Sequence, residues 1–248
     1  MHSVLSRFAL SGTPVSCEPY GSGHINGTQL VVCDNGAKYI LQQINTGVFR
    51  EPIPLMRNIE LVTAHLRRKI SDPRGVLCLV PTRDGMHYAV EDGSYWRVYD
   101  LVYDSVCYQA ATEALFHETA VAFGRFQNQL ADFPAEQLAE TIPHFHDTPA
   151  RFAAFVRAVE ENASGRIASV EPEIEFALGK QSFTHTLTDL QASGDLPLRV
   201  THNDTKINNV LFDAKTQKAL CIVDLDTVMP GLSVNDFGDA IRFGASTA

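Results

Sequence analysis

The sequence predicts an α+β fold in two lobes, the first built on antiparallel strands and the second mostly helical. The first hundred residues alternate β-prone runs with turn signals such as Asn-Gly and Asp-Gly. After about residue 105 the apolar residues recur at helical spacing, and short β-prone runs return only near the end. We therefore place an N-terminal nucleotide-binding lobe at 1–103 and a C-terminal catalytic lobe at 104–248.

One helix is expected to interrupt the strands of the first lobe. In residues 55–70 the apolar positions recur at helical spacing, and Pro52 and Pro54 stand just before this run. The Asn-Gly-Ala turn between the first two predicted strands makes them a hairpin. The predicted strands cover residues 28–34, 38–44, 75–81, 86–90 and 95–102.

The second lobe is expected to hold helices followed by a small sheet. A hinge near 100–108 separates it from the first lobe. The predicted helices cover residues 113–130, 151–161 and 171–180. The predicted strands cover residues 196–202, 209–213 and 219–224.

Composition and charge exclude several classes of protein. The net charge of −9 argues against a groove that follows nucleic-acid phosphates, because such a groove needs a basic surface. No apolar run approaches the ~20 residues that span a bilayer, and the apolar start is too short for a signal peptide. We expect a cytoplasmic protein without nucleic-acid or membrane partners, whose five scattered cysteines are reduced thiols.

The polar run Val-Thr-His-Asn-Asp-Thr-Lys-Ile-Asn-Asn, which starts at Val200, lies between two predicted strands. A polar loop between buried strands is a place where a rigid scaffold presents catalytic groups. Asp204 stands five residues before Asn209, which is the spacing of the protein-kinase catalytic loop. The spacing therefore indicates a catalytic loop of the kinase type.

Phosphoryl transfer explains the residue types in this loop. The reaction needs a carboxylate that orients the attacking hydroxyl and accepts its proton, and Asp204 is the candidate. Lys206 can offset charge near the transferred phosphoryl group. His202 is expected to brace the loop more than to touch substrate.

A Mg²⁺ site is predicted next to this loop. Asp224 and Asp226 end the next hairpin strand, and Asp224 follows Asp204 by 20 residues, a distance that one hairpin covers. With the side-chain oxygen of Asn209 they provide the oxygen ligands that Mg²⁺ prefers. The alternative for the whole pattern is an ordinary surface turn.

The literal Asp-Phe-Gly triplet that begins at Asp236 is not expected to bind the metal. Asp236 follows Asp204 by 32 residues and opens a helix-like stretch after a Pro-Gly turn. We expect Asp236 or Asp239 to brace the catalytic loop through backbone hydrogen bonds.

Five blocks of the sequence carry a resemblance to a known family: residues 16–26, 39–45, 201–213, 223–231 and 236–248. Together these blocks resemble the aminoglycoside phosphotransferase and choline kinase superfamily, and within it the N-acetylhexosamine 1-kinases. The resemblance implies a bilobal, protein-kinase-like fold and transfer from ATP, with Mg²⁺, to the anomeric hydroxyl of a small sugar acceptor, GlcNAc or GalNAc. It also implies further helices after Ala248, so we expect a second lobe that lacks its last helices and exposes an apolar face.

Two other interpretations stay open. The same machinery could serve another hydroxyl acceptor, such as homoserine, choline or an aminoglycoside. Alternatively, the chain is a truncated remnant that binds nucleotide without turnover.

A glycine-rich stretch, residues 19–28, is the candidate phosphate loop. Gly21 and Gly23 let backbone amides approach phosphates closely. His24 and Asn26 lie in the same stretch and are assigned to the nucleotide site. The alternative is a glycine-rich hairpin turn.

The kinase pattern places on the third strand a lysine that pairs with the phosphates and with a helix glutamate. Here the matching position is Gln42, or Gln43 by one register, and Glu60 matches the helix glutamate. A solvent-facing role for Glu60 is the alternative. Arg57 or Arg67 could replace the missing cation, and the sequence does not decide between them.

The hinge residues 95–104 would hold the adenine between apolar side chains. Trp96, the only tryptophan, is the candidate for stacking on the base. Packing in the core is its alternative role.

Overall fold

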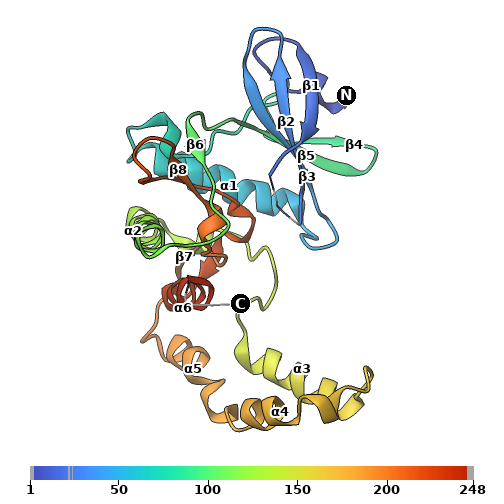
Figure 1. The fold of residues 1–248 in the computed structure, drawn as a ribbon, viewed down its shortest axis with the longest axis vertical. Coiled ribbons are helices and arrows are strands. Elements are labelled where there is room, and N and C mark those ends of the chain that lie inside the picture. The colour runs from blue at the N-terminus through green and yellow to red at the C-terminus, as the bar shows by residue number, and fades with distance from the viewer. Residues whose placement is uncertain (1–2, 22, 24, 245–248) are drawn as a thin grey trace. The chain divides into compact units, whose positions relative to one another are not determined.

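The structure is a computed structural model that describes residues 3–21, 23 and 25–244. It divides into two compact units, Met1–Ile142 with Arg199–Ala248, and Pro143–Leu198. Antiparallel strands and helices build the first unit, and helices build the second (Figure 1). The predicted α+β class is confirmed, and the lobe boundary after residue 103, which lies inside the first unit, stays a prediction.

A five-stranded antiparallel sheet forms the N-terminal part of the first unit (Figure 1). The hairpin predicted at 28–34 and 38–44 is confirmed as β2 and β3, whose turn uses Gly36 at a φ of 84°. In sheet order the strands are β1 (Pro14–Pro19), β2 (Gly27–Cys33), β3 (Lys38–Ile44), β5 (Ser94–Asp100) and β4 (Ala89–Glu91). This order places β5 directly beside β3, although about fifty residues separate them in the sequence.

The strand predicted at 75–81 is wrong. This segment begins in a 3₁₀ turn, Pro73–Gly75, and forms only an isolated bridge between Leu79 and Tyr99. The physical reason is competition for one edge, since β4 already pairs with the first residues of β5. The segment is nevertheless buried, which explains its apolar sequence.

Helix α1 (Pro52–Arg67) starts three residues earlier than predicted. Its two prolines lie in the first turn. Backbone N–H groups there have no acceptor within the helix, so proline, which lacks this group, costs no hydrogen bond. The buried face of α1 packs against Ile44 and Tyr99 of the sheet and against Phe126 and Leu225 of the later elements. One core therefore joins the sheet to the C-terminal part of the unit.

The later elements of the first unit surround a polar loop. The hairpin predicted around Lys-Thr-Gln-Lys is confirmed as β8 and β9, and the helix predicted at 113–130 is confirmed as α2, which Thr112 caps at the amide of Leu115. The elements are β6 (Ser105–Val106), α2 (Glu113–Gln129), β7 (Arg199–Thr201), β8 (Val210–Asp213), β9 (Ala219–Ile222), β10 (Met229–Gly231) and α6 (Ser233–Gly244).

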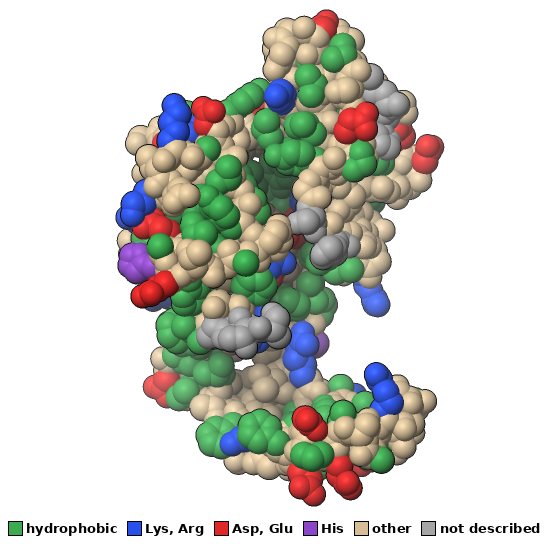
Figure 2. All heavy atoms as spheres, viewed as in Figure 1, with side chains coloured by type: hydrophobic (Ala, Val, Ile, Leu, Met, Phe, Trp, Pro, Cys, Tyr) green, Lys and Arg blue, Asp and Glu red, His purple; other side chains and the backbone are tan. Residues whose placement is uncertain are grey.

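The second unit consists of α3 (Thr148–Glu161), α4 (Glu171–Leu178) and α5 (Thr186–Ser193). The sequence patterns predicted α3 and α4 but not α5. Apolar side chains lie at the surface of this unit beside acidic ones (Figure 2), and Phe176 and Phe183 are 68% and 69% exposed. Within the described residues, no helix has both the length and the apolar character needed to cross a membrane.

Side chains of β5 alternate between the two faces of the sheet, as strand geometry requires. Trp96 and Val98 join a cluster that includes Val4 and Phe8. Tyr99 joins the cluster on the opposite face, which contains α1. Arg97 shares the α1 face, where its guanidinium contacts the sulfur of Met56 at 4.0 Å.

Candidate active site

One buried carboxylate holds the backbone of the polar loop that follows β7. Asp236, which is 2% exposed in the first turn of α6, accepts hydrogen bonds from the backbone amides of His202 (3.0 Å) and Asn203 (2.7 Å). It also accepts one from the Gln127 side chain (3.0 Å), while Asp239 accepts one from a further loop amide (2.8 Å). The predicted bracing role of these two aspartates is confirmed.

His202 is fully buried beneath the loop. Its Nε2 donates to the Val223 carbonyl at 3.0 Å, so Nε2 carries the proton. The ring packs edge-on against Phe123 and Phe126, at centroid distances of 5.2 and 5.8 Å. These contacts suit a residue that braces the loop and leave it without access to a substrate.

Asp204 is the half-buried carboxylate that the loop presents. One of its oxygens lies 2.8 Å from Lys206 Nζ and accepts a hydrogen bond of 2.8 Å from Asn209 Nδ2. The same amide donates to the Asp204 carbonyl at 2.9 Å. A carboxylate that is oriented and open to solvent can accept a proton from a bound hydroxyl.

Two further carboxylates follow β9. Asp224 adopts the left-handed conformation (φ 58°, ψ 58°), and Asp226 is 1% exposed. Burial and, after it, the nearby charges of Asp226 and Asp204 together raise the pKa of Asp224 to about 6, against the opposing effect of Arg97. The three carboxylates therefore share one region, and a cation there would relieve their repulsion.

The residues fit a magnesium ion by the chemistry of their donors. Asp224 and Asp226 supply carboxylate oxygens, and Asn209, whose nitrogen is used by Asp204, has its amide oxygen left to offer. Hard oxygen donors of this kind suit Mg²⁺. Among the described residues no group of three or more His, Cys, Asp or Glu side chains could hold a metal ion, so the amide and the nucleotide's own oxygens would have to complete the set.

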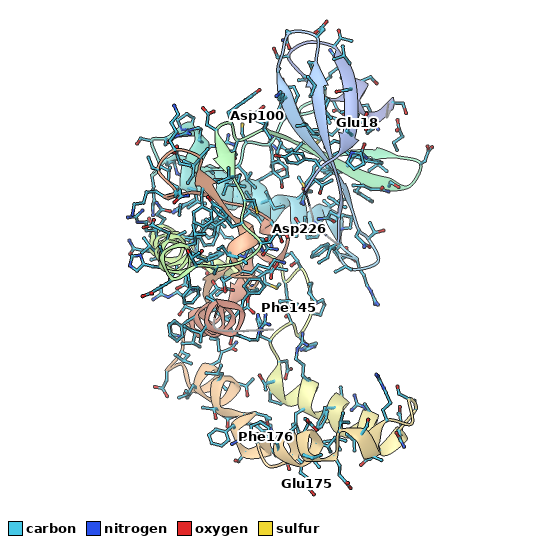
Figure 3. All side chains as sticks on the ribbon, in the orientation of Figure 1. Glu18, Asp100, Phe145, Glu175, Phe176 and Asp226 are labelled. Carbon is cyan, nitrogen blue, oxygen red and sulfur yellow. The ribbon has the colours of Figure 1, made fainter. Side chains whose placement is uncertain are left out.

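A buried network that the sequence patterns did not predict joins this region to the sheet. Arg97 donates from Nη1 to Asp226 Oδ1 at 2.5 Å and from Nε to Gln42 Oε1 at 3.0 Å. Asn26, from the glycine-rich stretch, donates to the other Asp226 oxygen at 2.6 Å. Figure 3 marks Asp226 between the sheet and the later elements of the first unit.

Arg97 keeps its charge although it is almost fully buried. Burial by itself lowers the pKa of the guanidinium, but the Asp226 carboxylate and other nearby groups outweigh this and hold the pKa above its ordinary value. Removing one partner of such a pair costs about 3–5 kcal/mol, because the other charge stays buried. A lone arginine in the apolar strand Tyr-Trp-Arg-Val-Tyr was the signal that could have found it.

The candidate cations named from the sequence lie elsewhere. Arg57 is exposed, and Arg67 donates to the Leu77 carbonyl at 2.7 Å. Glu60 lies 3.1 Å from His87 Nδ1 at the surface. Trp96 lies in the core on the other face of the sheet, away from Arg97, as its alternative role required.

The glycine-rich stretch connects β1 to β2. Gly21 has a φ of 77°, a conformation that favours glycine, and Gly21 and Gly23 are exposed. His24 lies outside the described residues. The side-chain oxygen of Asn26 accepts a hydrogen bond from the backbone amide of Asn45 at 3.0 Å. This bond holds the Asn26 side chain toward Asp226.

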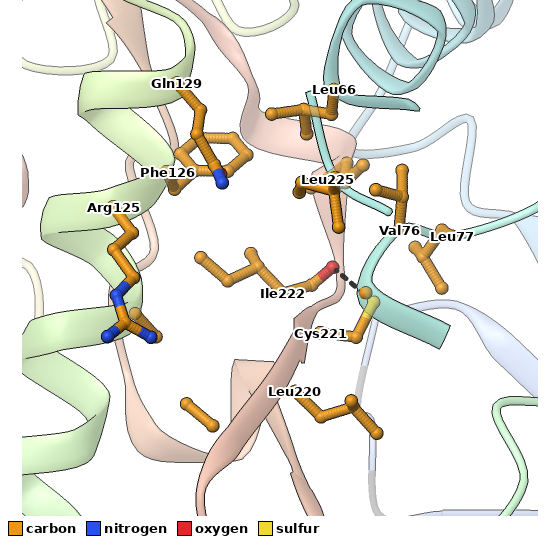
Figure 4. Close-up of a pocket in the computed structure, with 14 residues that line it drawn as sticks. Leu66, Val76, Leu77, Arg125, Phe126, Gln129, Leu220, Cys221, Ile222 and Leu225 are labelled. Carbon is orange, nitrogen blue, oxygen red and sulfur yellow. Dashed lines mark hydrogen bonds between the residues drawn. The ribbon is translucent and has the colours of Figure 1, made fainter. Parts of the chain in front are cut away.

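A small cavity of about 180 Å³ lies between α1, α2 and β9 (Figure 4). Leu66, Phe126, Cys221 and Leu225 are among its lining residues, and Arg125 and Gln129 come from α2. No residue predicted for the nucleotide, the metal or catalysis lines it. The chemistry of the site therefore lies outside this cavity.

Comparison with known proteins identifies a family and a fold. The model of the phosphotransferase enzyme family matches residues 16–248. The fold is similar to that of an aminoglycoside phosphotransferase from Alicyclobacillus acidocaldarius, with a TM-score of 0.64 and 12% identity over 96% of this chain and 69% of that one. It is also similar to amicoumacin kinase hAmiN, with a TM-score of 0.65 and 14% identity over 96% and 66%.

Choline kinase LicA from Streptococcus pneumoniae has a TM-score of 0.55 and 13% identity over 95% of this chain and 71% of that one. At these identities the similarity shows the fold. This chain spans about two thirds of the length of each of the three structures.

Proposed function

The chain belongs to the phosphotransferase enzyme family, and we propose that it transfers a phosphoryl group from ATP to the anomeric hydroxyl of an N-acetylhexosamine, GlcNAc or GalNAc. The observation that carries phosphoryl transfer is the loop that presents Asp204 beside Lys206 and Asn209, in the same region as Asp224 and Asp226. The sugar acceptor is supported by the sequence blocks that resemble N-acetylhexosamine 1-kinases.

Each residue of the loop has a distinct task in this proposal. Asp204 orients the acceptor hydroxyl and takes its proton, because its carboxylate is held at a fixed angle by Lys206 and Asn209. Lys206 then turns from Asp204 toward the transferred group, where its charge offsets the charge of the phosphoryl oxygens. His202 keeps the loop in place through the Val223 carbonyl.

The nucleotide and its metal are assigned to the residues on either side of Asp226. When bound, Mg²⁺ neutralises phosphate charge, and Asn209, Asp224 and Asp226 would hold it. Amides at Gly21 and Gly23 would contact the phosphates. The Asn26 contact with Asp226 brings the glycine-rich stretch to the carboxylates.

Release of ADP from Mg-ATP, with and without GlcNAc and GalNAc, tests the proposal. Asp204→Asn should lower sugar-dependent turnover by roughly 100-fold or more, the usual contribution of a general base, while ATP still binds. Asp92→Asn makes the same change in the exposed turn before β5 and should leave turnover unaltered. Full turnover by Asp204→Asn would contradict the assigned role.

A panel of acceptors separates the sugar from the other candidates. Choline, homoserine and an aminoglycoside should give no ADP above the background without acceptor. Turnover with one of these and not with the sugars would keep the phosphotransferase machinery and replace the acceptor. If the chain binds Mg-ATP but releases no ADP with the sugars or with any other acceptor, the result would support the nucleotide-binding remnant.

A further inference from the structure

We infer that Arg97, on β5, is the positioning residue that replaces the lysine expected on the third strand of a kinase-like sheet, and that it acts by holding Asp226 for Mg-ATP. This inference rests on the proposed function and adds a residue to it. In the kinase pattern the third strand carries the lysine, and here that strand carries Gln42. The positive charge is therefore carried by β5, the strand next to β3.

The register of the sheet puts the two positions side by side. Gln42 of β3 pairs directly with Arg97 of β5, and neighbouring strands are about 4.8 Å apart. The Gln42 amide donates to Thr28 Oγ1 at 3.0 Å, which leaves its oxygen to accept from Arg97 Nε at 3.0 Å. The guanidinium therefore occupies the space into which a longer, charged side chain at position 42 would extend.

Asp226 is oriented by this arrangement from both of its oxygens. Arg97 binds Oδ1 and Asn26 binds Oδ2, and the carboxylate is almost fully buried. A carboxylate fixed in this way has little rotational freedom to lose when a cation arrives. The Arg97 charge also offsets the repulsion between Asp226 and Asp224.

The helix glutamate of the kinase pattern takes no part in this network. Glu60 pairs with His87 at the surface, and the α1 atom that contacts Arg97 is the Met56 sulfur. Arg97 is thus paired with Asp226, a proposed metal ligand, whereas the lysine of the kinase pattern is paired with a helix glutamate. This difference explains why a glutamine can stand on β3.

The test moves the charge back to the third strand. Arg97→Met should weaken Mg-ATP binding, measured by isothermal titration calorimetry, by about 10- to 100-fold, the value of one or two hydrogen bonds to a charged group. Adding Gln42→Lys should restore the dissociation constant to within about threefold of wild type. A matched control adds Gln43→Lys, which places the same charge on the opposite face, where Gln43 contacts Ser94, and should restore nothing.

Circular dichroism establishes whether each variant is folded. If Arg97→Met alone is unfolded, recovery of both fold and Mg-ATP binding in Arg97→Met/Gln42→Lys, but not in Arg97→Met/Gln43→Lys, supports the inference equally. A Gln42→Lys double variant that stays unfolded, or that folds without binding Mg-ATP, overturns it. So does a folded Arg97→Met variant with wild-type affinity. Absence of Mg-ATP binding by the wild type would instead overturn the proposed function itself.

Discussion

Replacing Asp236 with alanine should release the catalytic loop from the core. The change leaves the amides of His202 and Asn203 buried without their acceptor. Each unsatisfied buried donor costs about 1–3 kcal/mol, so the two together should lower the free energy of unfolding by about 4 kcal/mol. Asp239→Ala removes one backbone acceptor from the same helix and should cost about 1 kcal/mol.

Hydrogen exchange measures this effect at the two amides themselves. A loss of about 4 kcal/mol corresponds to exchange roughly 1,000-fold faster at His202 and Asn203, since 1.36 kcal/mol equals a factor of ten. Urea unfolding followed by circular dichroism gives the global value. Unchanged exchange at these amides, with less than about 1 kcal/mol lost in urea, would refute the bracing role of Asp236.

Two further changes test the site and its packing. Burial and neighbouring charges raise the pKa of Asp224 to about 6, so its ionisation destabilises the folded, metal-free protein as pH rises from about 4 to about 6, and the loss is complete above that range. Asp224→Asn should therefore raise the free energy of unfolding by up to about 3 kcal/mol at pH 8 and by about half as much at pH 5, in urea titrations without Mg²⁺. Equal gains at both pH values would contradict the shift. Gly231→Ala should cost about 1–3 kcal/mol, because a Cβ there would overlap the Thr201 hydroxyl, whereas Gly124→Ala, in an open part of α2, should stabilise by up to about 1 kcal/mol in thermal melts.

Local patterns predicted the loop, the β8–β9 hairpin and α2 because the information lies within a few neighbouring residues. The polar loop stands between short apolar strands, and the hairpin turn is polar. The sequence indicated that Asp236 is not a metal ligand, because the Pro-Gly turn before it interrupts the hairpin geometry. Its hydrogen bonds to the loop agree with that prediction.

Arg97 could not be predicted in the same way. Its neighbour Gln42 is on another strand, and the register that joins them depends on β5 pairing with β3 on one side while it pairs with β4 on the other. The same competition for strand edges made 75–81 irregular. A lone arginine in an apolar strand marks residue 97 as unusual, but its place beside Gln42 follows only when the pairing of the whole sheet is known.

One buried polar side chain of helix α1 makes three hydrogen bonds to the later part of the first unit. Asn58 donates to the carbonyls of Ala139 (2.7 Å) and Val228 (2.9 Å) and accepts from the Ala139 amide (2.9 Å). In protein kinases the position of the corresponding helix switches activity on and off, through its glutamate. Here the helix is anchored by Asn58 and its Glu60 pairs with His87 at the surface, so this glutamate is not placed to link the helix to the buried carboxylates.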